Sequence, residues 1–107
     1  MLKNKTKNQI ITKDYRICKS LLSKTRGLMF SKKKNLIFEF EKEQKIGLHM
    51  LFVFFPIWVY YLDSNKKLLH KQKLLPFISA TNPKFKSRYI LELTMEADIN
   101  VGDILEW

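Results

Sequence analysis

Cysteine, glycine and proline are all scarce in this chain of 107 residues, which contains one cysteine, three glycines and three prolines. The single Cys18 excludes an intramolecular disulfide and a cysteine-based metal cluster, and it favours a reducing, cytoplasmic setting. So few glycines and prolines argue against a low-complexity linker. The basic first residues are not followed by the long apolar segment of a secretory signal peptide, so we expect none.

A membrane-spanning segment is also missing. The longest stretch without a formal charge covers residues 46–62, contains His49 and is interrupted by Pro56. A spanning helix needs about 20 apolar residues. The phenylalanine, valine, isoleucine, tryptophan and tyrosine of this stretch favour strands over helices. We therefore expect two buried strands that meet near Pro56, and no membrane span.

Acidic residues are half as numerous as basic ones, 10 against 20, which gives a formal net charge of +10. Residues 1–34 hold 11 basic residues against Asp14 alone, and residues 64–90 hold seven basic residues and no acid. Such segments can bind phosphate backbones or anionic lipid surfaces. Alternatively, lysine is simply the default solvated residue here. The scarcity of arginine fits this second interpretation, because sites that read nucleic-acid bases favour arginine.

What the sequence does contain indicates a single β-rich domain over residues 1–107, with residues 1–8 as a flexible basic N-terminus. Hydrophobic residues make up 46% of the chain and charged residues 28%, as in ordinary globular proteins. Residues 20–29 carry apolar side chains at helical spacing and predict one short helix, whereas residues 42–45 and 77–87 are expected to be connections. β-Branched or alternating segments predict strands within residues 9–18, 36–41, 47–55, 57–63, 66–75, 88–93 and 104–107. The expected fold is mainly β with one short helix, a compact antiparallel β-sandwich or barrel.

Six short segments occur in a suggestive order: RGLMF (26–30), NLIFEF (35–40), LHM (48–50), PIWVYYLD (56–63), LEL (91–93) and VGD (101–103). Together they resemble the domain-of-unknown-function family numbered 192, also called uncharacterised protein family 0127. The resemblance implies a compact β-rich domain, in a family with cytoplasmic and exported members, and implies no activity. Trp58 stands where the family usually has aspartate, and residues 51–53 replace a Lys-Asn-Thr segment of bacterial members. The resemblance therefore supports the fold more than a polar site.

Four residues are candidates for a binding site. Arg26 can hold an anion in a bidentate manner, and Gly27 allows close backbone approach; a structural ion pair of Arg26 with Asp63 or Asp103 is the alternative. His49 is a candidate because its pKa lies near neutrality, although a histidine hydrogen-bonded to the backbone explains it as well. Asp63 begins the turn at residues 63–65 and is more typical of a turn residue than of a catalytic one. The hypothesis is that Arg26, His49 and Asp63 converge.

These observations favour a small domain that binds a small ligand or a protein partner without catalysis. One alternative is a nucleic-acid-binding module that uses residues 1–34 and 64–90, and another is a small enzyme of unknown reaction. His49 and His70 lack a matched carboxylate or thiolate spacing, so we expect no metal site. The sequence has no glycine-rich phosphate loop or paired-carboxylate motif, and we expect no cofactor and no catalytic residue.

Overall fold

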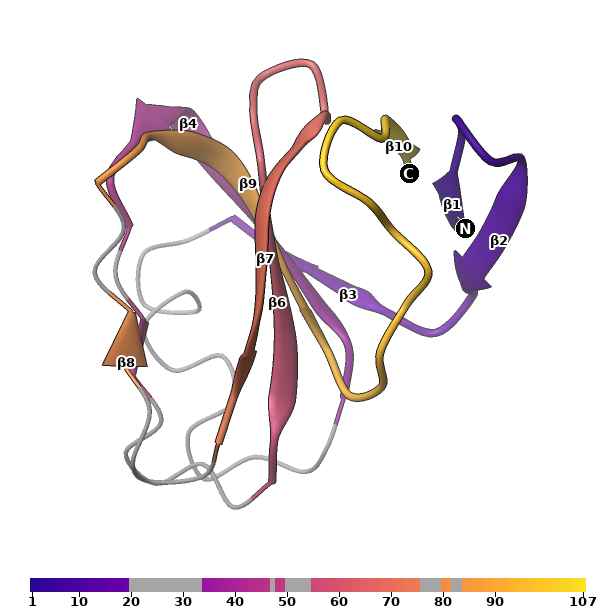
Figure 1. The fold of residues 1–107 in the computed structure, drawn as a ribbon, viewed down its shortest axis with the longest axis horizontal. Coiled ribbons are helices and arrows are strands. Elements are labelled where there is room, and N and C mark those ends of the chain that lie inside the picture. The colour runs from indigo at the N-terminus through magenta and orange to yellow at the C-terminus, as the bar shows by residue number, and fades with distance from the viewer. Residues whose placement is uncertain (20–33, 47, 50–54, 76–79, 82–83) are drawn as a thin grey trace.

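A computed structural model describes residues 1–19, 34–46, 48–49, 55–75, 80–81 and 84–107. Regular structure in these ranges consists of strands, arranged as in Figure 1. The strands are β1 (Leu2–Asn4), β2 (Gln9–Thr12), β3 (Arg16–Cys18), β4 (Leu36–Gln44), β5 (Leu48–His49), β6 (Ile57–Leu62), β7 (Leu68–Leu74), β8 (Ala80–Thr81), β9 (Ser87–Leu93) and β10 (Leu105–Glu106).

Five of the strands form the main sheet, in the order β3-β4-β9-β6-β7. Its neighbours are antiparallel except for β3 and β4, which run parallel. Because successive side chains of a strand point to opposite faces, the apolar strands at the centre supply both faces of this sheet. Along β6, for example, Val59 and Tyr61 contribute to one core cluster while Tyr60 and Leu62 contribute to another.

A smaller sheet of three strands joins the two ends of the sequence, in the order β10-β1-β2. The pairs Lys3↔Glu106 and Lys3↔Ile10 place β1 between its two antiparallel partners. Leu2 and Asn4 of β1 are fully buried, and Lys3 between them is half-buried. The flexibility expected of residues 1–8 as a whole stays a prediction.

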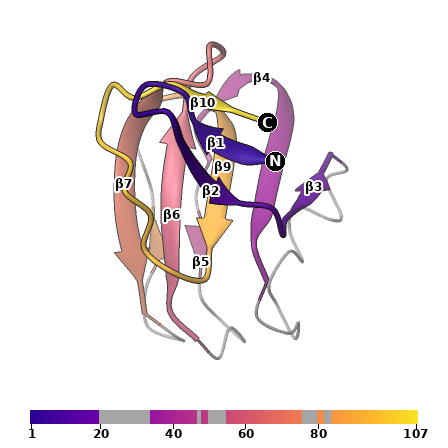
Figure 2. The ribbon, with the colours of Figure 1, turned by 90° about the vertical axis from the view of Figure 1, so that its right-hand side faces the viewer.

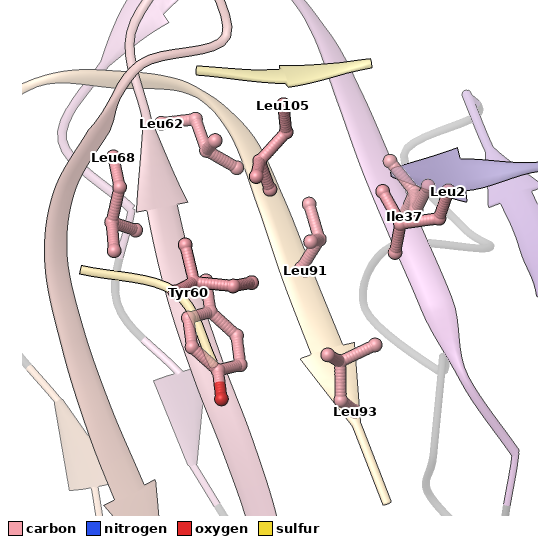
Figure 3. Close-up of a cluster of buried hydrophobic side chains, with 9 residues drawn as sticks. Leu2, Ile37, Tyr60, Leu62, Leu68, Leu91, Leu93 and Leu105 are labelled. Atoms are coloured by element: carbon pink, nitrogen blue, oxygen red, sulfur yellow. The ribbon is translucent and has the colours of Figure 1, made fainter. Parts of the chain in front are cut away.

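The two sheets pack face to face around one hydrophobic cluster, with β1 and β2 lying over the main sheet in Figure 2. Leu2 and Leu105 enter this cluster from the small sheet, and side chains such as Tyr60 and Leu91 enter it from the main sheet (Figure 3). A second cluster, which includes Val59, lies on the opposite face of the main sheet. The antiparallel β-sandwich is thus confirmed. The main sheet does not close into a barrel, because β3 and β7 at its edges do not pair.

Several predicted elements have different bounds in the structure. The strand expected over residues 9–18 is divided into β2 and β3, and β4 continues through residues 42–44, where a connection was expected. The short helix expected at residues 20–29 lies outside the described residues, as does most of the strand expected at 47–55. In the part of the chain that is described, no helix has the length and apolar character needed to cross a membrane.

A two-stranded sheet of β5 and β8 completes the described strands, with His49 paired to Ala80 in antiparallel register.

Candidate functional site

The four residues singled out from the sequence are only partly placed by the structure. Arg26 and Gly27 lie outside the described residues, and of His49 only the backbone position in β5 is described. Asp63 begins the turn between β6 and β7, where its Oδ1 accepts hydrogen bonds from the backbone N–H groups of Asn65 (2.8 Å) and Lys67 (3.0 Å). Asp63 therefore has the role of a turn residue. The convergence of Arg26, His49 and Asp63 stays a prediction.

A groove of about 300 Å³ lies between β2 and the segment that follows β9. All four residues of β2 line one side, residues 93–98 line the other, and Asn35 also contributes. Figure 1 shows how the two walls come together: β2 belongs to the small sheet, and residues 93–98 continue from the central strand β9 of the main sheet. The groove is therefore a product of the packing of the two sheets.

Side chains from neighbouring elements hold the wall at residues 93–98 in place. The side-chain carbonyl of Asn35 accepts hydrogen bonds from the backbone N–H of Thr94 (2.9 Å) and from its hydroxyl (3.1 Å). Further along the wall, the buried Tyr60 hydroxyl accepts a 2.9 Å hydrogen bond from the backbone N–H of Ala97, whose carbonyl lies 3.4 Å from the same oxygen. Burial raises the pKa of Tyr60, so this hydroxyl keeps its proton at neutral pH.

The end of the same wall is attached to the small sheet. Lys7 Nζ lies 2.6 Å from Oδ1 of Asp98, and the side-chain amide of Asn4 donates to the Asp98 carbonyl oxygen at 3.2 Å. Asn4 also donates to Oδ2 of Asp103, which accepts the backbone N–H of Asn100 as well. These two hydrogen bonds hold the pKa of Asp103 below its usual value. The groove wall is thus fixed at Thr94, Ala97 and Asp98 before any ligand arrives.

Between these fixed points, Met95 and Glu96 are directed to solvent. Met95 is 73% exposed, and Ile10 on the opposite wall is 55% exposed. Glu96 and Asp98 are the charged residues among those that line the groove, and Asp98 is already paired with Lys7. Within the described residues Glu96 has no ion pair. The groove therefore combines exposed apolar side chains with one uncompensated negative charge, in a chain whose net charge is +10.

A second unusual feature lies on the other face of the main sheet. Glu92 alternates with Leu91 and Leu93 of β9, so it faces the side of Ile90 and the second hydrophobic cluster. Only 6% of Glu92 is exposed, and burial raises the pKa of its carboxyl from 4.5 to about 8. The buried Cys18 lies close enough to Glu92 for the two groups to interact. Burial raises the pKa of the Cys18 thiol, the charge of Arg16 lowers it, and Glu92 raises it further. Both groups are therefore held in their neutral forms at neutral pH.

Some of the basic residues that the structure describes make intramolecular contacts. Lys71 Nζ donates to the carbonyl oxygen of Ile99 at 2.8 Å. Lys66 Nζ lies 4.1 Å from the centre of the Trp107 ring, and Lys73 Nζ lies 5.0 Å from that of Trp58. Since much of residues 1–34 is not described, the continuous positive face required for nucleic-acid binding stays a prediction.

The groove was not predicted from the sequence, because its two walls come from segments more than 80 positions apart. The run Met95-Glu96-Ala97-Asp98 was a partial indication of the groove, because it places a large apolar residue beside acidic residues directly after a strand. The buried position of Glu92 was indicated more clearly, because Glu92 is an acidic residue inside the apolar strand segment 90–93. Within the described ranges, no three His, Cys, Asp or Glu side chains gather in a way that could hold a metal ion.

Curated archaeal proteins resemble the whole chain. The UPF0127 protein of Pyrococcus horikoshii is 32% identical over 114 residues, which cover 100% of this chain and 98% of that protein. The UPF0127 protein of Pyrococcus furiosus is 33% identical over 111 residues and covers 97% of this chain and 95% of its own length. A UPF0127 protein of Thermococcus sibiricus is 29% identical, with 100% of this chain and 74% of that protein covered.

Two crystal structures share the fold. One is a protein of Sinorhizobium meliloti 1021 that is provisionally named a transcription regulator; its TM-score is 0.78 at 17% identity, with 86% of this chain and 79% of that chain covered. The other is a protein of unknown function from Novosphingobium aromaticivorans, with a TM-score of 0.78 at 16% identity and a coverage of 87% and 74%. At these identities the likeness concerns the fold alone.

The model of the DUF192 family, which is described as "Uncharacterized ACR", matches residues 2–107. This range includes both walls of the groove, the buried Glu92 and the small sheet formed by the two ends of the sequence. The chain therefore belongs to the DUF192 family, also called UPF0127.

Proposed function

We propose that this protein is a binding domain, and that its site is the groove between β2 and residues 93–98. The ligand has an apolar part and a cationic group, and it is bound without chemical conversion. The observation that carries this proposal is the composition of the groove, in which the exposed Ile10 and Met95 accompany the carboxylate of Glu96, which has no ion pair with any residue that the structure describes. Ligand sites are typically concave, mostly apolar and supplied with a few placed polar groups, and this groove has those properties.

The fixed position of the groove wall supports the proposal energetically. A site that has to be ordered by its ligand loses affinity to the entropy of that ordering. Here Asn35 holds Thr94, Tyr60 holds Ala97, and Lys7 holds Asp98 in the free protein. Most of that cost is therefore met by folding, and a small ligand can bind with little rearrangement of the backbone.

Ligand charge is the property that tests the proposal most directly. Hexylammonium and hexanoate have similar apolar chains but opposite charges, so titration of the ¹⁵N-labelled protein with each compares the two head groups. We expect hexylammonium to shift the amide resonances of residues 9–12 and 93–98, with a dissociation constant on the order of 1 mM for so small a ligand. Hexanoate is expected to bind more weakly, because Glu96 repels it.

Two variants with equal charge change serve as the matched pair. Glu96→Gln removes the carboxylate of the groove, whereas Glu41→Gln removes an exposed carboxylate on β4. We expect Glu96→Gln to weaken hexylammonium binding about two- to fivefold, as is usual for an exposed ion pair, and Glu41→Gln to leave it unchanged. Equal weakening by both variants, or shifts confined to residues outside the groove, would contradict the proposal.

A further inference from the structure

We infer that the natural occupant of the groove is an extended peptide segment that pairs with β2 and extends the small sheet by one strand. This inference rests on the proposed function and narrows its ligand class to a peptide with an apolar residue and a basic residue. Strand addition of this kind draws affinity from main-chain hydrogen bonds and specificity from pockets for alternate side chains.

The lining of the groove shows that it runs along an edge of β2. Side chains of a strand alternate between its two faces, so a groove over one face would be lined by every second residue. Here the four consecutive residues Gln9, Ile10, Ile11 and Thr12 all line it. β1 occupies one edge of β2, and β2 stands at the end of the order β10-β1-β2. The groove therefore follows the edge that has no partner strand among the described residues.

The composition of β2 also distinguishes it from the other edge strands of the two larger sheets. Proteins commonly protect exposed edges with charged side chains, lysine in particular. The other three such strands carry charges: Arg16 in β3, Lys71 and Lys73 in β7, and Glu106 in β10. β2 has the sequence Gln-Ile-Ile-Thr and carries no charge. Among these four edge strands, β2 is therefore the one that has no charged side chain to prevent pairing with another strand.

Charge selects the kind of peptide. A segment lying along β2 passes between Ile10 and the opposite wall, where Met95 offers apolar contact and Glu96 offers a carboxylate. An apolar side chain that points into the groove is covered by Met95, and a neighbouring lysine or arginine reaches Glu96. An acidic segment would instead meet the carboxylates of Glu96 and Asp98. The occupant is therefore expected to be basic and apolar, and a second copy of this chain is not required.

The test compares peptides that differ only in the backbone or in one charge. The probe is a capped hexapeptide in which valine alternates with threonine and one end carries lysine. Its first twin has N-methyl groups on alternate backbone nitrogens, which removes hydrogen-bond donors and keeps every side chain. Its second twin has glutamate in place of lysine. Each is titrated into the full-length ¹⁵N-labelled protein, and amide exchange of residues 9–12 is followed with and without peptide.

We expect the lysine peptide to shift and protect the amides of β2, and both twins to bind at least tenfold more weakly. Met95→Lys is expected to weaken the lysine peptide at least tenfold. Val101→Lys is its matched control, because Val101 is 65% exposed and does not line the groove, and this variant should bind as the parent does.

Four outcomes would overturn the inference. If the N-methylated twin binds as well as the parent peptide, side chains alone fill the groove, and the proposed function stands without strand addition. If hexylammonium binds in the groove and the peptide does not, the ligand is a small molecule. If sedimentation shows a dimer whose formation protects residues 9–12, the occupant is a second copy. Failure of both hexylammonium and the peptide to shift the groove resonances would remove the proposed function as well.

Discussion

The side-chain amide of Asn4 donates a 2.9 Å hydrogen bond to Oδ2 of Asp103, and 99 positions of sequence separate the two residues. Asn4 is fully buried, and its side chain makes two further contacts, with the Asp98 carbonyl oxygen and with the backbone N–H of Lys7. One amide thus ties the start of the small sheet to the loop that precedes β10. Asp103 belongs to VGD (101–103), one of the segments that resemble the family. This contact gives Asp103 a structural role.

We expect Asn4→Ala to lower the free energy of unfolding by about 1–3 kcal/mol, because it leaves a buried carboxylate and a backbone carbonyl without their donor. Urea denaturation followed by circular dichroism measures this change. Asn65→Ala is the control, since Asn65 is exposed in the turn between β6 and β7, and its effect should stay within about 0.5 kcal/mol. Equal effects of the two substitutions would show that the Asn4 side chain does not hold the small sheet.

Glu92 should make the stability of the protein depend on pH. Its pKa is about 8 in the folded chain and near 4.5 when exposed, so between these values the folded state binds the proton that the unfolded state has released. Stability therefore falls as pH rises from 4.5 to 8. We expect Glu92→Gln to remove this dependence and to be more stable than the parent at pH 8, by up to a few kcal/mol. Urea unfolding at pH 5, 6.5 and 8 measures this pH dependence, and Glu41→Gln is the exposed control. If the stabilities of the parent and of Glu92→Gln changed in parallel with pH, Glu92 would not be the group responsible.

Tyr60→Phe tests how the groove wall is held. The substitution removes the hydroxyl that accepts the N–H of Ala97, at a cost of about 1–2 kcal/mol in stability, and leaves the ring in the core. We expect faster hydrogen exchange at Ala97 and weaker binding of hexylammonium, while exchange in β4 stays close to that of the parent. Tyr15→Phe is a comparison with a hydroxyl outside the groove, since Tyr15 interacts with the terminal amine of Met1. Unchanged exchange at Ala97 in Tyr60→Phe would show that other contacts fix the wall.

A cation–π contact should couple Lys66 to Trp107. The ammonium lies 4.1 Å from the centre of the indole ring and 3.3 Å from the Trp107 carbonyl oxygen, while the indole N–H donates to Glu39 at 2.9 Å. Lys66→Met is expected to cost about 0.5–1 kcal/mol in the parent and clearly less in a Trp107→Leu background. A thermal denaturation cycle of the two substitutions measures the coupling. The neighbouring Lys67→Met should show none, because Lys67 enters the turn through its backbone: its N–H donates to Oδ1 of Asp63 and its carbonyl oxygen accepts the N–H of Asp63.

Much of the fold was predictable because local patterns reflect burial. The strand-forming residues of 57–63 and 88–93 predicted strands that the structure contains as β6 and β9, and the turn chemistry at Asp63 was predicted as well. Lys66 is an exception in that turn. It has φ of 61°, where glycine is the usual residue, and its contact with Trp107 offers a reason for lysine there.

Other features depend on long-range pairing and left little trace in the sequence. β1 has only three residues in a lysine- and asparagine-rich segment, and its burial depends on β10, about a hundred positions away. Likewise, Ile10 and Met95 look like isolated exposed apolar residues until the packing of the two sheets places them on one groove. Patterns within a segment report its own burial, and they do not report which distant segment it meets.

The pairing of β1 with β10 has a consequence for the order of folding. Closing a loop of about a hundred residues has an entropic cost that must be met before the contact gives any stabilisation. The main sheet is made of strands between Arg16 and Leu93, so it can assemble before the small sheet. We expect the small sheet to form late, and to unfold first under load applied at the two ends. The groove depends on both sheets, so it should appear only in this last kinetic step.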